Sequence, residues 1–182
     1  ISCHEEGILS QNTNVNAEPF ALKKSARLNV SNETRKAFHG TVRWSLRRND
    51  ASVIAEGCAP VTVPALSALW LDEQDFSSEN TYETYYAYAL YDESENCVGE
   101  GSVLFCPPKH FRFIDPKLSV RLEGDEIIVS ASAYAKSVEI RNENDDLILS
   151  DNFFDINGGE RRAKIIKGEP IGLSVRSVFD IK

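Results

Sequence analysis

Residues that could carry catalysis are few in this 182-residue chain, and they do not stand at catalytic spacings. The three histidines are far apart, at positions 4, 39 and 110, and a lone histidine is more often a surface residue than a ligand. The sequence contains no nucleophile elbow, zinc-protease motif, phosphate loop or dinucleotide fingerprint. We therefore expect no catalytic residue, no metal ligand and no cofactor in this chain.

Cysteines are the next candidates for chemistry. They stand alone, with no Cys-x-x-Cys pair and no histidine at metal-binding spacing. We expect free thiols in buried or half-buried positions, with a disulfide as the alternative. The four residues concerned are Cys3, Cys58, Cys97 and Cys106.

Carboxylates cluster at residues 72–75 (DEQD) and at Asp145-Asp146. Calcium needs several converging oxygens, and neither cluster follows a known loop spacing, so solvated loop residues are favoured. Glycosidic hydrolysis needs two carboxyl groups that face each other across the bond, and the sequence nominates no such pair. Exposed aromatic rings could instead stack on sugars. Trp70 is the main candidate for such a contact, because alternation places most of the tyrosines of residues 82–91 in the core or in a strand face.

Charge and hydropathy exclude two classes of partner. The chain carries 28 acidic and 20 basic residues, for a net charge of −8, and no basic block that could hold phosphates. No apolar run approaches the roughly 18 residues that a membrane span requires. We expect neither nucleic acid nor membrane as a partner. Because the sequence contains no Met and begins at Ile1, we also expect it to be a fragment of a longer protein.

Short runs of alternating apolar and polar residues predict an all-β chain, with turns every 8–12 residues. Trp44 lies on the apolar side of one run, where a core tryptophan belongs between two sheets. Residues 10–18 are polar and rich in turn formers. The expected strands are residues 1–6, 20–31, 38–46, 53–56, 61–63, 68–71, 82–91, 102–106, 118–122, 127–133, 138–141, 147–149, 163–166 and 171–179.

The segment 102–116 (SVLFCPPKHFRFIDP) predicts a boundary between two domains. Two consecutive prolines end a strand and form a stiff extended connector. We expect two tandem immunoglobulin-like β-sandwiches, one over residues 1–108 and a smaller one over residues 109–182. The aromatic residues around the prolines should pack in the seam between them. The expected seam residues are Phe105, Pro107, Pro108, Phe111 and Phe113.

Several segments together resemble the C-terminal part of the β-mannosidases of glycoside hydrolase family 2. These are residues 2–7 (SCHEEG), 26–32 (ARLNVSN), 103–109 (VLFCPPK), 149–155 (LSDNFFD), 158–160 (GGE) and 175–180 (VRSVFD). The resemblance implies an assembly of five domains, in which two immunoglobulin-like sandwiches follow a catalytic TIM barrel. The catalytic glutamates of that family lie in the barrel, and no position in this chain matches them.

The resemblance implies non-catalytic accessory domains, whose partner is the catalytic TIM barrel of the same parent chain. Such a parent would hydrolyse terminal β-linked mannose from oligosaccharides, with retention and without a cofactor. Its location is left open between periplasm, secretory route, lysosome and cytoplasm. The alternative is a pair of carbohydrate-binding modules for mannan-like glycans, and a third hypothesis is a cell-surface adhesion tandem. Asn29 and Asn32 match the N-glycosylation pattern, and the sequence leaves their use open.

Overall fold

A computed structural model describes residues 1–7 and 23–181, and the polar segment 10–18 lies outside this range. The described residues are almost entirely β-structure and form two compact units. Unit 1 comprises Ile1–Arg47 and Val53–Arg112, and unit 2 comprises Arg48–Ser52 and Phe113–Lys182. The expectation of an all-β chain with two sandwich domains is confirmed.

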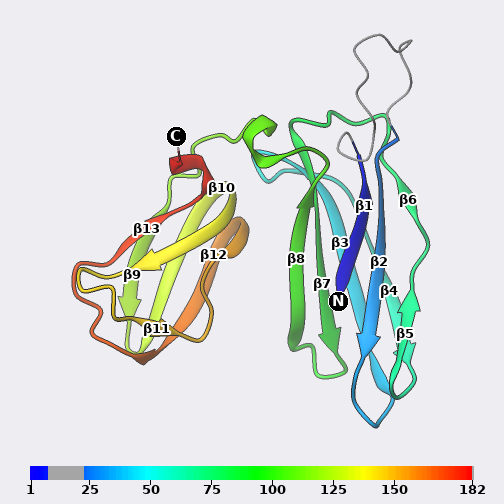
Figure 1. The fold of residues 1–182 in the computed structure, drawn as a ribbon, viewed down its shortest axis with the longest axis horizontal. Helices are drawn as coiled ribbons and strands as arrows, with labels where there is room; N and C mark the ends of the chain where they lie inside the picture. The colour runs from blue at the N-terminus through cyan, green and yellow to red at the C-terminus, as the bar shows by residue number, and fades with distance from the viewer. Residues whose placement is uncertain (8–22, 182) are drawn as a thin grey trace. The chain divides into compact units, whose positions relative to one another are not determined.

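Unit 1 is a sandwich of two antiparallel sheets (Figure 1). The first sheet has the order β1-β2-β5, and β6 also pairs with β2. The second has the order β4-β3-β7-β8, so the tyrosine-rich strand β7 is central, as its sequence predicts. The strands are β1 (Ser2–Glu6), β2 (Ser25–Asn32), β3 (Phe38–Arg48), β4 (Val53–Val63), β5 (Ser67–Trp70), β6 (Gln74–Asp75), β7 (Thr84–Asp92) and β8 (Cys97–Leu104).

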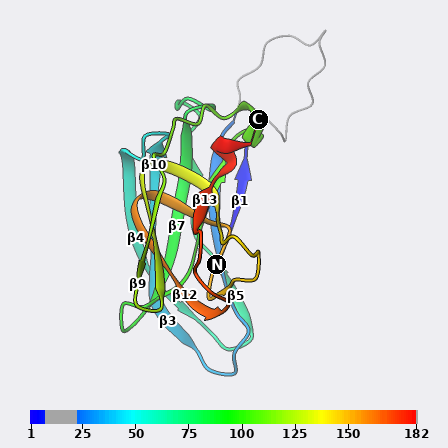
Figure 2. The ribbon, with the colours of Figure 1, turned by 90° about the vertical axis from the view of Figure 1, so that its left-hand side faces the viewer.

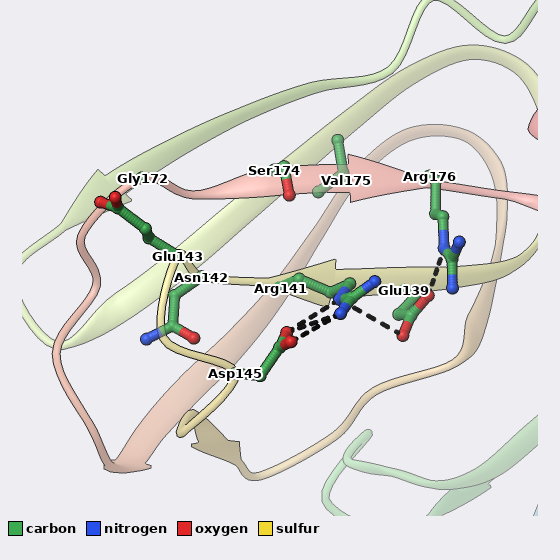
Figure 3. Close-up of a pocket in the computed structure, with 9 residues that line it drawn as sticks. All are labelled: Glu139, Arg141, Asn142, Glu143, Asp145, Gly172, Ser174, Val175 and Arg176. Atoms are coloured by element: carbon green, nitrogen blue, oxygen red, sulfur yellow. Dashed lines mark hydrogen bonds and ion pairs between the residues drawn. The ribbon is translucent and has the colours of Figure 1, made fainter.

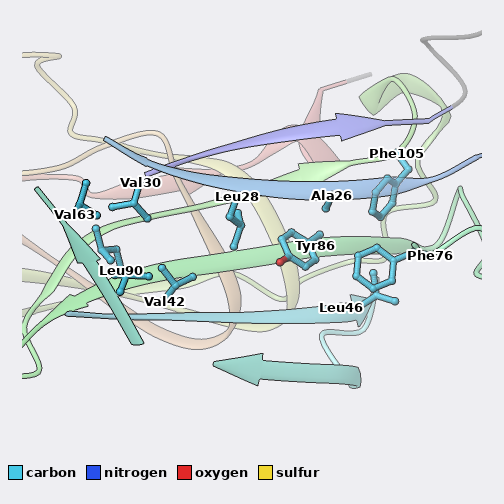
Figure 4. Close-up of a cluster of buried hydrophobic side chains, with 11 residues drawn as sticks. Ala26, Leu28, Val30, Val42, Leu46, Val63, Phe76, Tyr86, Leu90 and Phe105 are labelled. Carbon is cyan, nitrogen blue, oxygen red and sulfur yellow. The ribbon is translucent and has the colours of Figure 1, made fainter. Parts of the chain in front are cut away.

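Alternation along the strands places apolar residues of both sheets in one core (Figure 4). Ala26, Leu28 and Val30 of β2 are each about 1% exposed, and they face the second sheet. Trp44 of β3 packs against this core, with its ring stacked 5.8 Å from that of Tyr86. Burial of such large aromatic side chains is a main source of stability in a domain of this size.

Strand β4 differs from the sequence expectation of two short strands. It runs unbroken from Val53 to Val63 and includes Pro60, which lies opposite Thr41 of β3. Strand β4 lies at the edge of its sheet and has a hydrogen-bonded neighbour on one side. Proline, which has no N–H to donate, is tolerated in such edge strands.

Unit 2 has five strands in its described residues, with the order β11-β12-β10-β13 and with β9 also paired to β10. A single-turn 3₁₀ helix, η3 (Val178–Asp180), follows the last strand, and another, η2 (Pro108–His110), belongs to unit 1. The strands are β9 (Ser119–Glu123), β10 (Glu126–Arg141), β11 (Ile148–Leu149), β12 (Phe154–Lys167) and β13 (Ser174–Arg176).

The long strand β10 replaces two expected strands and is interrupted by two register shifts against β12, after Ala131 and after Ala135. Such bulges let a strand bend, so that its first residues pair with β9 and its last three with β13 (Figures 1 and 2). Gly158 and Gly159, which the sequence predicts as a turn, lie inside β12 with positive φ angles of 78° and 88°. Only glycine adopts these angles without strain inside a strand.

Candidate functional site

Trp70 is the last residue of β5 and pairs with Asn29 of β2, on the outward side of the first sheet. Its side chain is 48% exposed. The guanidinium of Arg27 lies over the ring, 5.1 Å from the centroid, and Arg27 Nε donates to the carbonyl oxygen of Leu71 at 3.0 Å. One face of the indole is therefore covered by a cation that is itself held in place, which fixes the ring orientation.

The tyrosines of β7 offer no comparable platform. Tyr85 and Tyr86 are fully buried, and Tyr88 and Tyr91 are half-buried. Arg43 lies over the Tyr91 ring at 4.5 Å. The sequence prediction that most of these rings serve the core is confirmed for Tyr85 and Tyr86.

An open groove lies in unit 2, with a cavity volume of about 600 Å³ (Figure 3). It is formed by the end of β10, the loop that follows it, and strand β13 with the residues before it. Its side chains are mostly charged or polar. The lining residues are Glu139, Arg141, Asn142, Glu143, Asp145, Gly172, Ser174, Val175 and Arg176.

Strand pairing places the groove side chains beside each other. Glu139 lies opposite Arg176, and Arg141 lies opposite Ser174, in the antiparallel register of β10 and β13. Glu139 and Arg141 point outward because the residue between them, Ile140, is buried. The Asn152 side chain accepts from the Ile140 N–H at 2.9 Å and donates to the Ile140 carbonyl at 3.1 Å, which holds this end of β10.

Ion pairs fix both guanidiniums of the groove. Arg141 binds Asp145 in a bidentate manner, with Nη2 at 2.8 and 2.7 Å from the two carboxylate oxygens. This contact holds the pKa of Arg141 above its usual value. Arg176 donates to the carboxylate of Glu139. Bidentate pairs of this kind give fixed geometry as well as attraction.

Glu143 differs from the other carboxylates of the groove. No lysine or arginine among the described residues forms an ion pair with it. It extends towards Gly172 at one end of the groove (Figure 3). A Cβ at position 172 would lie 3.0 Å from Glu143 Cβ and 3.5 Å from its carboxylate Oε2. Glycine at position 172 therefore leaves room for the Glu143 side chain.

Each of the three connector aromatics makes a ring contact within its own unit. Phe105 belongs to the unit 1 core, with its ring centroid 6.0 Å from that of Phe76. Phe111 meets Tyr85 of unit 1 edge-on, at 6.5 Å. In unit 2, Phe113 stacks on Tyr134 at 6.0 Å. Pro107 precedes η2, and Pro108 is its first residue. The expected role of these residues in a seam between the domains stays a prediction.

Asn32 is a buried structural residue. Its Nδ2 donates to the carbonyl oxygens of Lys36, Val63 and Pro64 at 2.8, 3.0 and 3.0 Å. Its Oδ1 accepts from the N–H of Thr34 at 3.1 Å. A glycan on Nδ2 is incompatible with these three bonds in the folded chain. Asn29 is 7% exposed, so neither acceptor asparagine is open in the folded unit.

The four cysteines are free thiols, which confirms the preferred prediction over a disulfide. Cys106 is buried and Cys3 is half-buried, and burial raises the pKa of the Cys3 thiol to about 12. Contrary to expectation, Cys58 and Cys97 are exposed, because they lie on the outward side of the β4-β3-β7-β8 sheet.

The described residues contain no group of three or more His, Cys, Asp and Glu side chains placed to hold a metal ion. Of the two acidic clusters, Glu73 pairs with Lys23 at 2.6 Å and Asp145 with Arg141. Nor does any helix in residues 1–7 and 23–181 have the length and apolar character of a membrane span.

Sequence reasoning missed the groove. Its residues come from positions 139–145 and 172–176, and only the pairing of β10 with β13 brings them together. One local signal was present. The alternation of charged residues with Val138 and Ile140 marks an outward row of Glu139 and Arg141 at the end of a strand.

Comparisons with known proteins agree with this architecture. Residues 24–110 match the family described as Mannosidase Ig/CBM-like domain, and residues 113–180 match a second family described as Ig-fold domain, of the mannosidase type. A search of curated proteins found no match.

Solved structures with the same fold include a β-D-mannosidase from Dictyoglomus thermophilum and the exo-chitosanase CsxA of Amycolatopsis orientalis. The first is 18% identical, with a TM-score of 0.64, and the match covers 89% of this chain and 21% of that one. The second is 12% identical, with a TM-score of 0.51, and the match covers 86% of this chain and 25% of that one. The chain thus spans a fifth to a quarter of the length of these structures.

Proposed function

Since the chain belongs to the immunoglobulin-like domains of the family 2 mannosidases, we propose that it is a non-catalytic accessory part of a larger glycoside hydrolase. Its partner in this role is a catalytic barrel of the same parent chain, which the sandwiches brace. The parent hydrolyses terminal β-linked mannose from oligosaccharides and needs no cofactor.

The extent of the matches carries this proposal. Two immunoglobulin-like families account for residues 24–110 and 113–180 of the 182 residues. A TIM barrel takes about 250 residues, so this sequence cannot contain one. The match covers only 21% of the similar β-D-mannosidase, so about four fifths of that enzyme has no counterpart in this chain. The proposal assigns catalysis to the part of the parent that has no counterpart here.

Deletion of residues 1–182 from the parent enzyme tests the bracing role. The expected result is an enzyme that still hydrolyses a chromogenic β-mannoside but loses activity faster at elevated temperature. The matched comparison is the intact parent under the same conditions. An unchanged inactivation half-life on deletion would contradict a bracing role.

A second candidate function, carbohydrate binding by unit 1, is favoured by one observation. Trp70 keeps nearly half of its surface exposed, while Arg27 holds the ring from one side. Affinity electrophoresis in mannan tests this candidate. If Trp70 binds the polysaccharide, the chain should be retarded and Trp70→Ala should abolish the retardation. Val98→Ala is the control, because Val98 is also an exposed apolar residue of unit 1.

A further inference from the structure

The groove of unit 2 has the dimensions of a ligand site. Binding sites for small molecules are typically clefts of about 300–1,000 Å³, and this groove has a volume of about 600 Å³. It is open, so a ligand chain could continue beyond either end. Its walls are held by strand pairing and by the Asn152 bonds to Ile140. The groove is therefore largely formed before any ligand arrives.

The charges of the groove disfavour anionic ligands. Two guanidiniums, those of Arg141 and Arg176, face three carboxylates, those of Glu139, Glu143 and Asp145. Each guanidinium is already paired with a carboxylate within the groove. The lining thus carries one net negative charge, and no free cation remains in it to attract a phosphate, a sulfate or an acidic sugar.

The polar groups instead match a ligand with many hydroxyl groups. Each hydroxyl donates one hydrogen bond and accepts others, whereas a guanidinium only donates and a carboxylate only accepts. In the groove the two kinds of group lie side by side, as Arg176 beside Glu139 and Arg141 beside Asp145. Adjacent hydroxyls on a ring could therefore satisfy both partners of a pair at once, without breaking the pair.

The spacing along the strand favours a chain over a single small molecule. Glu139 and Arg141 are two residues apart on β10, which separates them by about 6.6 Å. Ser174 adds a neutral hydroxyl that both donates and accepts. The Asn142 amide is buried and bonded to Asp146 and Glu169, so it shapes the end of the groove. Because the ion pairs fix the side chains in advance, little conformational entropy is lost on binding.

We propose that the groove formed by β13, the end of β10 and the loop after it binds a neutral oligosaccharide. The two Arg–carboxylate pairs hold vicinal hydroxyl groups, and Glu143, the unpaired carboxylate, accepts from a further hydroxyl. This site goes beyond the accessory role proposed above, and it is separate from Trp70. If the groove binds no sugar, the chain can still be an accessory part of a glycosidase. The binding experiment and the deletion experiment therefore test the two proposals separately.

Calorimetric titration of the 182-residue chain with β-1,4-linked mannohexaose tests the site. Cellohexaose, a chitosan oligosaccharide and an oligogalacturonate serve as further probes. We expect binding of at least one neutral hexasaccharide and none of the oligogalacturonate. Glu143→Ala should weaken this binding at least about tenfold, because a hydrogen bond to a charged group is lost. Ser174→Trp, which fills the groove, should abolish it.

Two controls keep the test decisive. The melting temperature of each variant shows that it is folded, and Glu143→Ala breaks no ion pair of the described residues. Val98→Ala should leave the affinity unchanged, because Val98 is an exposed apolar residue of unit 1 that lines no part of the groove. Absence of binding to both neutral hexasaccharides would overturn the proposal. Equal binding by Ser174→Trp would do so too, as would binding confined to the chitosan probe, which would reflect the negative charge alone.

Discussion

Asn32 offers the sharpest test of the unit 1 architecture. It ends β2, and its side chain joins that strand to the turn at Lys36 and to the end of β4. Asn32→Ala removes the Nδ2 amide, whose two N–H groups serve three carbonyl oxygens, and the acceptor for the Thr34 N–H. The Val63 carbonyl, whose bond to Asn32 is buried, would be left without this donor.

The magnitude follows from these contacts. A hydrogen bond contributes about 1 kcal/mol net, and an unsatisfied buried acceptor costs about 1–3 kcal/mol. Since part of the Asn32 network is accessible to water, we expect a loss of about 3 kcal/mol in the free energy of unfolding. For a domain of about 100 residues this corresponds to a fall in melting temperature of roughly 12 °C.

Asn29→Ala is the matched control, because Asn29 lies on the same strand and is equally buried. Its Oδ1 accepts one bond, from the Ser31 hydroxyl at 2.8 Å, so the expected loss is about 1 kcal/mol or less. Urea unfolding followed by tryptophan fluorescence measures both variants. Trp44 and Trp70, the two tryptophans of the chain, both report on unit 1. If the two variants lost the same free energy of unfolding to within about 0.5 kcal/mol, the Asn32 side-chain bonds would not contribute as described.

Three further predictions concern packing, acid stability and thiol access. Gly57→Ala places a Cβ 2.6 Å from Trp44 Cζ2, and the forced shift should cost about 1–3 kcal/mol in urea unfolding. Pairing with Arg121 lowers the pKa of Glu160 to about 2 in the folded chain, from 4.5. The pair therefore contributes fully to stability above pH 4.5, and this contribution is lost as the pH falls towards 2. Between pH 5 and 2, the melting temperature of Glu160→Gln should fall less than that of the unchanged chain. A thiol reagent should label two cysteines rapidly in the folded chain, and the expected pair is Cys58 and Cys97.

Each of these predictions has a clear contrary result. If Gly57→Ala were as stable as the unchanged 182-residue chain, the Trp44 ring would move without a cost in free energy. If Glu160→Gln and the unchanged chain lose melting temperature equally between pH 5 and 2, the pair with Arg121 does not contribute in this range. Rapid labelling of all four thiols, or of none, would contradict the burial pattern.

Much of unit 1 could be predicted because its strands are half-buried and show clean alternation. Ala26, Leu28 and Val30 face the core, and the polar residues between them face outward. Trp44 was placed on the correct side for the same reason. Pro60 misled the division of β4, since sequence alone does not show that a strand lies at the edge of a sheet, where proline is tolerated.

Unit 2 was harder to predict because its long strands contain bulges. Gly158 and Gly159 have the composition of a hairpin turn, yet they continue β12 opposite the first bulge of β10. The groove depends on the same pairing, because Arg141 and Arg176 are 35 positions apart in the sequence. Long-range register of this kind follows from tertiary packing, and local residue preferences do not specify it.

We propose that this chain supports a glycosidase without performing its chemistry. Incubation of the purified 182-residue chain with a chromogenic β-mannoside, followed by absorbance of the released phenolate, tests this claim most directly. We expect no release above that of a buffer blank at high protein concentration, while the intact parent enzyme turns over the same substrate. Release of the phenolate in proportion to the concentration of this chain would contradict it.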